Sequence, residues 1–187
     1  MTTTSPPEPT GRLVPAPDAD DNDNDDRGNG DPAYDLVLTR TLPGSLADAW
    51  ASVTEPDRTA RWFGRWEGVG AVGETIRIQL GFEEGTPWTE AQIAECAAPH
   101  RLRVVTVDDA GSWDLAVDLA PSEKGPERTE LRFVMHRVDP ATVGEVGPGW
   151  EYYLDQLLAA LTGADLPDFG DYFPAQRAYY ADQGAAD

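Results

Sequence analysis

The apolar residues of Trp150–Leu161 recur at the spacing of an α-helix. From the first residue of this segment they fall at i+3, i+4, i+7, i+8 and i+11, which places them in one continuous stripe. A helix of this length is unstable alone in water, so it requires an apolar surface to pack on. Gly163 is expected to end it. Pro148 favours a start near Gly149, although Ala141 is an alternative.

Most of the chain before this helix alternates apolar and polar residues, as β-strands with one buried face do. Two short apolar helical faces follow the first strand, at Ser45–Val53 and Asp57–Trp62. The expected strands are Tyr34–Leu42, Val72–Phe82, Trp88–Cys96, Leu102–Val107, Ser112–Leu119 and Arg128–Val138. Because helices and strands do not alternate, a parallel sheet is disfavoured. The sequence therefore predicts an α+β fold in which a curved, antiparallel, six-stranded sheet wraps around one long C-terminal helix.

The N-terminal segment Met1–Asp31 is rich in Pro, Asp, Asn and Gly, a composition typical of disorder. We expect a disordered acidic segment over residues 1–33 and a single domain over 34–187, with a C-terminal tail from about residue 163. The acidic run Asp18–Asp26 lacks the ligand spacing, the turn glycine and the closing glutamate of a calcium loop. A solvating acidic tail is therefore favoured over a calcium site.

The net charge of −20, from 34 acidic and 14 basic residues, narrows the classes of partner. It argues against nucleic-acid binding and against docking on anionic membranes. Apolar runs are too short to span a bilayer. The first ten residues lack the features of a secretory signal, and the single cysteine, Cys96, excludes an intramolecular disulfide. These features favour a cytoplasmic protein.

Residues of obvious chemical function are few. The glycines of Gly68–Gly73 match G-x-G-x-x-G, but they precede a strand, whereas the dinucleotide motif follows a strand and opens a helix. A flexible loop at the rim of a cavity is favoured instead. His100 and His136 have no metal-binding spacing and are expected at the surface, and Cys96 is expected to be a small buried residue. We therefore predict no metal, no cofactor and no catalytic residue.

Four stretches form a pattern in combination: Leu46–Gly64, Cys96–Leu102, Gly149–Leu161 and Asp165–Pro174. In this order they resemble the START-like (SRPBCC) helix-grip superfamily, specifically the branch related to the C-terminal domain of the heat-shock-chaperone ATPase activator. The resemblance covers roughly Tyr34–Pro174. It implies a deep, mostly apolar cavity between sheet and helix. Members of the superfamily bind lipids, sterols, polyketides or plant hormones, some cyclise polyketides, and some act on chaperones. The fold by itself does not give the function.

In a helix-grip fold, aromatic and large apolar residues either line the cavity or fill the core, and core filling is the more common outcome. The candidate lining residues are Trp62, Phe63, Trp66, Trp88, Trp113, Phe133, Met135, Trp150, Tyr153 and Leu157. We expect Arg40, Arg77 and Arg137 at the surface. An arginine pointing into the cavity would instead select a ligand with a carboxylate.

Three functions compete at this stage. The first is non-enzymatic binding of a small apolar or amphipathic ligand between sheet and helix. The second is a protein-interaction module that acts on a chaperone or in a stress response. The third is a polyketide cyclase-like or hydrolase-like enzyme, for which His136 and the three arginines are the candidates. We expect a monomer or a homodimer.

Overall fold

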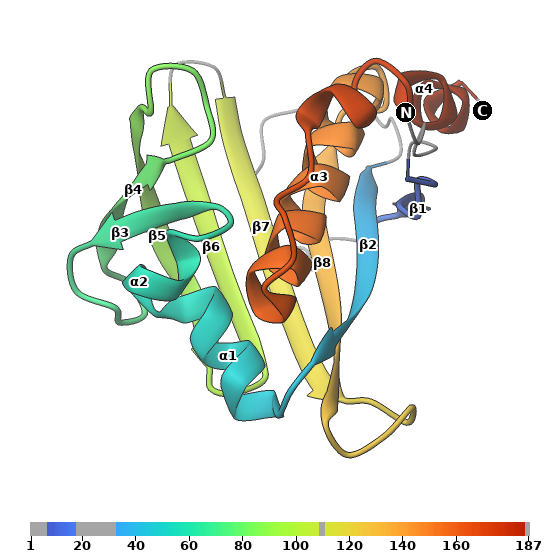
Figure 1. The fold of residues 1–187 in the computed structure, drawn as a ribbon. Coiled ribbons are helices and arrows are strands. Elements are labelled where there is room, and N and C mark those ends of the chain that lie inside the picture. The colour runs from blue at the N-terminus through green and yellow to red at the C-terminus, as the bar shows by residue number, and fades with distance from the viewer. Residues whose placement is uncertain (1–6, 18–32, 109–110, 186–187) are drawn as a thin grey trace.

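The structure is a computed structural model that describes residues 7–17, 33–108 and 111–185. A strongly curved antiparallel sheet holds the long helix α3 against its inner face, and the short helices α1 and α2 lie beside the other half of the sheet (Figure 1). The strand order is β1-β2-β8-β7-β6-β5-β4-β3. The predicted α+β class, with its antiparallel sheet and long C-terminal helix, is confirmed.

The bounds of the elements follow the predicted order with additions at both ends. The strands are β1 (Arg12–Pro15), β2 (Tyr34–Pro43), β3 (Gly64–Glu67), β4 (Thr75–Leu80), β5 (Trp88–Ala97), β6 (Arg101–Asp108), β7 (Gly111–Pro121) and β8 (Arg128–Val138). The helices are α1 (Leu46–Thr54), α2 (Pro56–Thr59), α3 (Val143–Thr162) and α4 (Arg177–Gly184), with a 3₁₀ turn, η1, at Phe169–Asp171.

The described sheet has eight strands, so the predicted number of six was wrong. One added strand is β3, in a segment that was expected to be a loop. A loop was expected there because these residues show no alternation of apolar and polar side chains. Gly64 permits this pairing, since a Cβ there would lie 2.0 Å from the backbone oxygen of Gln79. The other added strand, β1, pairs with β2 and corrects the disorder predicted for this part of the N-terminal segment. The acidic run Asp18–Asp26, considered for calcium, lies outside the described residues.

Helix α3 begins at Val143, not near Gly149, and it contains Pro148. Proline removes one helical N–H, so the first turns need support from outside the helix. That support comes from α4, which packs so closely that a Cβ on Gly147 would lie 2.5 Å from the ring of Tyr180. The segment after residue 163 is therefore more than a tail, because it includes a packed helix. Gly163 ends α3 in a left-handed conformation, as predicted.

The main core lies where α3 packs on β2 and β8. Its buried members include Leu36, Leu38, Leu131, Phe133, Leu154 and Leu157. These residues come from the inward-facing positions of the strands and from the apolar stripe of the helix. Within the described ranges, no helix combines the length and the apolar content needed to cross a bilayer.

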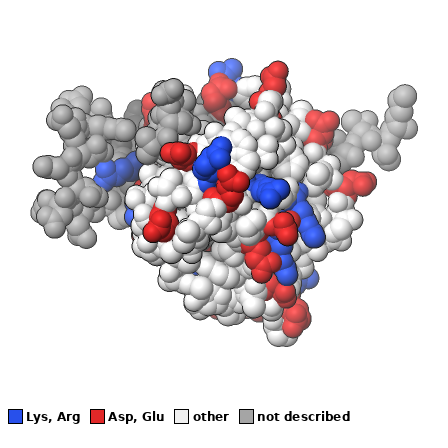
Figure 2. All heavy atoms as spheres, turned by 90° about the vertical axis from the view of Figure 1, so that its left-hand side faces the viewer, with Lys and Arg blue, Asp and Glu red and all other residues white. Residues whose placement is uncertain are grey.

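On the side of the molecule away from the main core, positive and negative side chains are interspersed and do not form a patch of one charge. Figure 2 shows the face formed by the β3–β5 half of the sheet and α2, where acidic and basic side chains lie next to one another. Exposed pairs such as Arg77–Glu67, at 2.7 Å, belong to this half. Such pairs contribute little to stability but keep the surface solvated.

Candidate functional site: an apolar pocket

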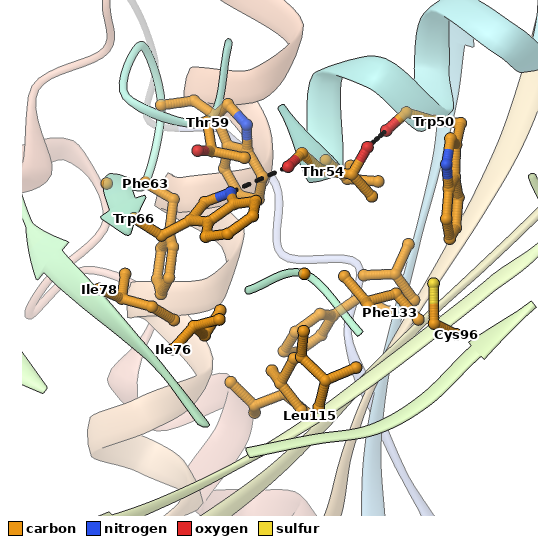
Figure 3. Close-up of a pocket in the computed structure, with 18 of the residues that line it drawn as sticks. Trp50, Thr54, Thr59, Phe63, Trp66, Ile76, Ile78, Cys96, Leu115 and Phe133 are labelled. Atoms are coloured by element: carbon orange, nitrogen blue, oxygen red, sulfur yellow. Dashed lines mark hydrogen bonds between the residues drawn. The ribbon is translucent and has the colours of Figure 1, made fainter. Parts of the chain in front are cut away.

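A pocket of about 340 Å³ lies between the α1–α2 segment, the inner face of the sheet and the side chain of Trp150 on α3. Figure 3 shows Trp50, Trp66 and Phe63 on one side of this space, and Ile76, Leu115 and Phe133 on the other. Each strand from β3 to β8 contributes at least one side chain, because the inward positions of adjacent antiparallel strands share one face. The pocket is therefore formed jointly by six strands of the curved sheet.

Five of the ten candidate residues line the pocket: Trp62, Phe63, Trp66, Phe133 and Trp150. Four of them form chains of ring contacts. The ring centres of Trp150 and Phe133 are 4.3 Å apart, those of Trp150 and Phe63 are 6.0 Å apart, and those of Phe63 and Trp62 are 5.6 Å apart. These residues combine large apolar faces with a fixed arrangement, which suits the wall of a binding site.

The other five candidates lie elsewhere. Met135 and Leu157 are buried in the main core, and Tyr153 packs on Phe63 while its hydroxyl donates to Glu83 Oε1 at 2.6 Å. Burial, and then this hydrogen bond, raise the pKa of Tyr153, so its hydroxyl stays protonated.

The two remaining tryptophans are exposed. Trp88 is 39% exposed on the outer face of the sheet, where the guanidinium of Arg77 lies 4.7 Å from its ring centre. Trp113 is 40% exposed, and its ring centre lies 6.1 Å from that of Trp150.

Most of the aliphatic lining was not among the predicted residues, because it comes from ordinary inward strand positions. These residues are Ile76, Ile78, Ile93, Leu102, Val104, Leu115 and Val117. Trp50 and Val53 of α1 and Gly70 of the β3–β4 loop also contribute. The strand alternation predicts that such residues face inward, but it does not tell whether they meet other side chains or an open space.

Cys96 also lines the pocket, and it is exposed, so the predicted burial was wrong. A register shift in β5 between Ile93 and Glu95 places Cys96 opposite Leu102, which also lines the pocket. A bulge of this kind moves the following residues to the opposite face of a strand. Cys96 consequently faces the pocket side, at its open end.

Four polar side chains of the lining bond to the protein's own backbone. Trp66 Nε1 donates to the backbone oxygen of Thr54 at 2.9 Å, and Thr54 Oγ1 donates to the backbone oxygen of Trp50 at 2.7 Å. Thr59 and Trp62 likewise donate to backbone oxygens. No Asp, Glu, Lys, Arg or His side chain is among the described residues that line the pocket. The pocket can therefore hold an apolar molecule, but its lining has no pair of side chains that could act as general acid and general base.

The histidines and arginines considered earlier lie away from the pocket. His100 is exposed, as predicted. His136 is more buried than expected, with 22% of its side chain exposed, because its Nδ1 lies 3.0 Å from the carboxylate of Asp35. Arg40 is paired with two carboxylates of α3, on a side of the helix away from the pocket lining. In the part of the chain that the structure describes, no three His, Cys, Asp or Glu side chains are grouped to hold a metal ion.

Comparison with known proteins agrees with this architecture. A family model described as "Activator of Hsp90 ATPase homolog 1-like protein" matches residues 44–162. Comparison with curated proteins gives no match.

Several solved structures share the fold. The crystal structure of CalU16 from Micromonospora echinospora has a TM-score of 0.69 at 19% identity and covers 95% of this chain and 97% of that chain. DynU16, from the dynemicin biosynthetic locus, has a TM-score of 0.60 at 18% identity and covers 72% and 50% of the two chains. The Aha1 dimer from Colwellia psychrerythraea has a TM-score of 0.57 at 16% identity and covers 68% and 95%. At these identities the likeness concerns the fold. The family match spans well over half of the sequence, and so this chain belongs to the family of Activator of Hsp90 ATPase homolog 1-like proteins.

Proposed function

We propose that the protein binds a small, uncharged, apolar molecule in this pocket and does not transform it. The observation that carries the proposal is the lining itself, which is aromatic and aliphatic and contains no charged side chain among the described residues. A volume of about 340 Å³ lies at the lower end of the range found for small-molecule sites. Transfer of an apolar ligand from water into this space is favoured by the hydrophobic effect.

The pocket also disfavours charged ligands. A carboxylate in the pocket would lose its hydration and find no cationic partner, because no Lys, Arg or His side chain is among the described residues of the lining. The predicted alternative of an arginine that selects a carboxylate is not supported, since Arg40 and Arg77 are paired elsewhere. We therefore restrict the ligand class to neutral molecules.

The test is a pair of substitutions on β6. Val104 lines the pocket, whereas Val105 alternates to the other face, where its register partners are Gln92 and Asp114. We expect the neutral dye Nile red to bind the wild-type protein with one-to-one saturation. Val104→Phe fills the pocket and weakens this binding by about tenfold, while Val105→Phe changes it little.

Native mass spectrometry of the freshly purified protein complements the dye measurement. A neutral molecule that co-purifies with the wild-type protein and is lost in Val104→Phe would support the proposal. Absence of saturable dye binding, or equal affinity in the two phenylalanine variants, would refute it.

The family match favours a second function, a cofactor role for a heat-shock chaperone. In this case the protein stimulates the ATPase rate of an Hsp90-type chaperone, and the pocket variants leave that stimulation unchanged. An unaltered ATPase rate at low ionic strength, where charge interactions are strongest, would count against it. The cyclase-like or hydrolase-like alternative has no comparable support, because His136 lies outside the lining.

A further inference from the structure

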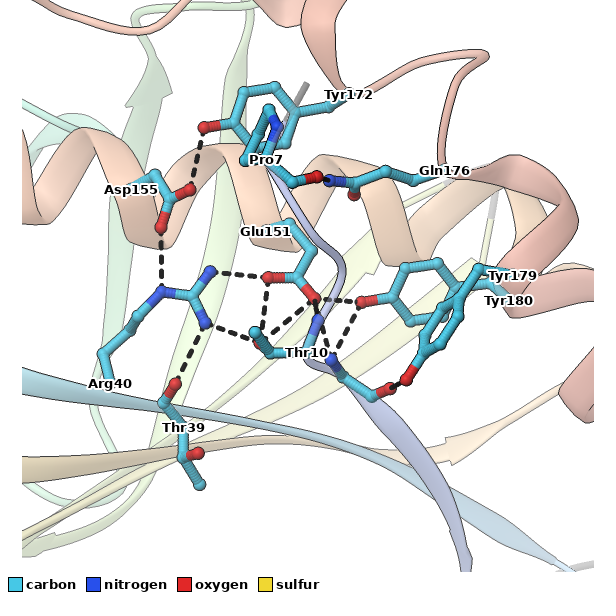
Figure 4. A network of polar contacts seen from close by, with 11 residues as sticks. Pro7, Thr10, Thr39, Arg40, Glu151, Asp155, Tyr172, Gln176, Tyr179 and Tyr180 are labelled. Atoms are coloured by element: carbon cyan, nitrogen blue, oxygen red, sulfur yellow. Dashed lines mark hydrogen bonds and ion pairs between the residues drawn. The ribbon is translucent and has the colours of Figure 1, made fainter. Parts of the chain in front are cut away.

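A cluster of polar side chains lies on the other side of α3 from the apolar pocket. This cluster binds the N-terminal residues of the same chain. Figure 4 shows the carboxylate of Glu151 surrounded by Thr10, Arg40 and Tyr180. Glu151 has 1% of its side chain exposed, and it accepts hydrogen bonds from two consecutive backbone amides, those of Thr10 and Gly11. It also accepts from the hydroxyl of Tyr180 and pairs with Arg40. A carboxylate in this position recognises an extended backbone.

Further groups contact the same segment along its length. Gln176 Nε2 donates to the backbone oxygen of Pro7 at 2.8 Å, and Tyr179 donates to that of Gly11 at 3.0 Å. The amide of Leu13 donates to Gln183 Oε1 at 3.0 Å. Strand β1 also pairs in antiparallel register with β2. The contacts are mostly to backbone atoms, which is the way a strand is added to the edge of a sheet.

One position of the segment is restricted to glycine by the groove. A Cβ on Gly11 would lie 2.4 Å from the hydroxyl oxygen of Tyr180 and 3.0 Å from Cγ of Leu38. The next residue, Arg12, is exposed and makes no side-chain hydrogen bond or ion pair within the described parts of the chain. The segment therefore contains one position where a substitution should disturb its binding, Gly11, and a neighbouring position where a substitution should not, Arg12.

The groove is joined to the pocket through the start of α3. Glu151 follows Trp150 directly, so the two side chains leave the same turn toward the groove and toward the pocket. Pro148, one turn earlier, supplies no helical N–H. The close contact of Tyr180 with Gly147 and the bonds of Glu151 give this turn additional tertiary support.

We propose that the groove formed by β2, α3 and α4 is a peptide-binding site, filled by residues 7–15 of the same chain, and that its occupancy fixes Trp150 in the pocket wall. Both the segment and α4 lie outside residues 44–162, the part of the chain that the family model matches. Only the consequence for ligand affinity rests on the proposed function.

The test uses the full-length chain with Gly11→Ala, which expels the segment, and Arg12→Lys as control. A fluorescein-labelled peptide of residues 7–17 is titrated against each protein and followed by fluorescence anisotropy. We expect the peptide to bind the Gly11→Ala chain at least about tenfold more tightly than it binds the wild-type or Arg12→Lys chain, whose grooves are filled. A peptide that carries the same glycine-to-alanine change should not bind.

The link to the pocket is measured by ¹⁹F NMR of protein labelled with 5-fluorotryptophan, with the Trp150 signal assigned by Trp150→Phe. In Gly11→Ala this signal shifts and returns when the unlabelled peptide saturates the groove, whereas the signal of exposed Trp88 stays constant. Nile red affinity should fall about threefold and recover in the same titration.

The outcomes separate the two proposals. Failure of the peptide to bind Gly11→Ala, or an unchanged Trp150 signal, would overturn this inference even if the dye binds. Absence of dye binding to the wild-type chain would reject the proposed function, while the anisotropy and ¹⁹F measurements still decide this one. If Gly11→Ala does not fold, Leu13→Ala weakens the packing of the segment on the core and leaves the groove itself unchanged, and the same measurements apply.

Discussion

At the scale of single residues, the most consequential group is the buried carboxylate of Glu151. Removing one partner of a buried ion pair leaves the other charge without compensation, in this case Arg40 with only Asp155. We predict that Glu151→Gln lowers the free energy of unfolding at pH 7 by about 3 kcal/mol.

Urea unfolding followed by circular dichroism measures this loss. The control is Glu145→Gln on the same helix, where the ion pair with Arg177 is exposed, and it should cost less than about 1 kcal/mol. Equal losses in the two variants would contradict the assignment of a buried charge network.

The same carboxylate makes stability depend on pH. Burial raises the pKa of Glu151, but the hydrogen bonds from Tyr180 and Arg40 and the charge of Arg40 outweigh it, so the pKa lies below 4.5. Because the folded state binds the proton less readily than the unfolded state, this stabilisation is complete above about pH 4.5 and is lost as the pH falls through the folded pKa.

We therefore predict that wild-type stability declines below about pH 4.5 more steeply than that of Glu151→Gln. Urea midpoints between pH 3 and pH 7 measure the difference. Parallel pH profiles for the two proteins would show that other carboxylates dominate, such as Glu95 and Glu130, whose pKa values are also lowered.

Residue positions were predictable from the sequence where a regular period applied. The helical stripe that contains Trp150 and Leu157 was recognised, but its period does not tell that Trp150 reaches the pocket while Leu157 fills the core. The position of Cys96 in the pocket was not predictable, because alternation from Ile93 places Cys96 on the outer face and the bulge that reverses this has no strong sequence signature.

At the scale of elements, the structure contains the predicted strands and the long helix. It differs from the prediction where an element is stabilised by contacts between residues that are far apart in sequence. Strand β1 forms because it pairs with β2 and because Glu151, Tyr179 and Gln183 bind the backbone of Gly11 and Leu13, and none of these three residues is near β1 in sequence. The start of α3 at Val143 likewise depends on α4, which overrides the local effect of Pro148. Local pattern alone cannot reveal such tertiary support.

Two glycines within α3 test that support directly. A Cβ on Gly147 would lie 2.5 Å from the ring of Tyr180, whereas one on Gly149 meets nothing within 4 Å. We predict that Gly147→Ala destabilises the protein by about 1–3 kcal/mol because α4 must move. Gly149→Ala should stabilise it by about 0.5–1 kcal/mol, since alanine has the higher helix propensity. Urea unfolding of both variants measures the sign of each change in the free energy of unfolding. A stabilising Gly147→Ala would mean that α4 does not pack as described.

At the scale of the whole molecule, the fold was predictable because its class depends on the order of elements, and the pocket was predictable only in part. Pocket volume is what remains after all side chains are placed, so it reflects residues from six strands and three helices at once. The aromatic residues Trp62 and Phe63 indicated its position. The open space between them and Leu115 is a property of the sheet's curvature, which no single stretch of sequence records.

The charge of the chain also acts at this scale. With a net charge of −20, the folded protein repels itself more than the expanded chain does, although many arginines are paired. Salt shortens the Debye length from roughly 30 Å at 0.01 M to about 3 Å at 1 M, which weakens this long-range repulsion more than it weakens partly buried pairs.

We predict that the melting temperature rises by about 3–6 °C between 0.02 and 0.5 M KCl, a change of roughly 1–2 kcal/mol for a chain of this length. Calorimetry in KCl, rather than in sulfate salts that strengthen hydrophobic burial, isolates the charge effect. A melting temperature that falls with added salt would show instead that the ion pairs of the sheet, such as Arg103 with Asp114, dominate the electrostatic free energy.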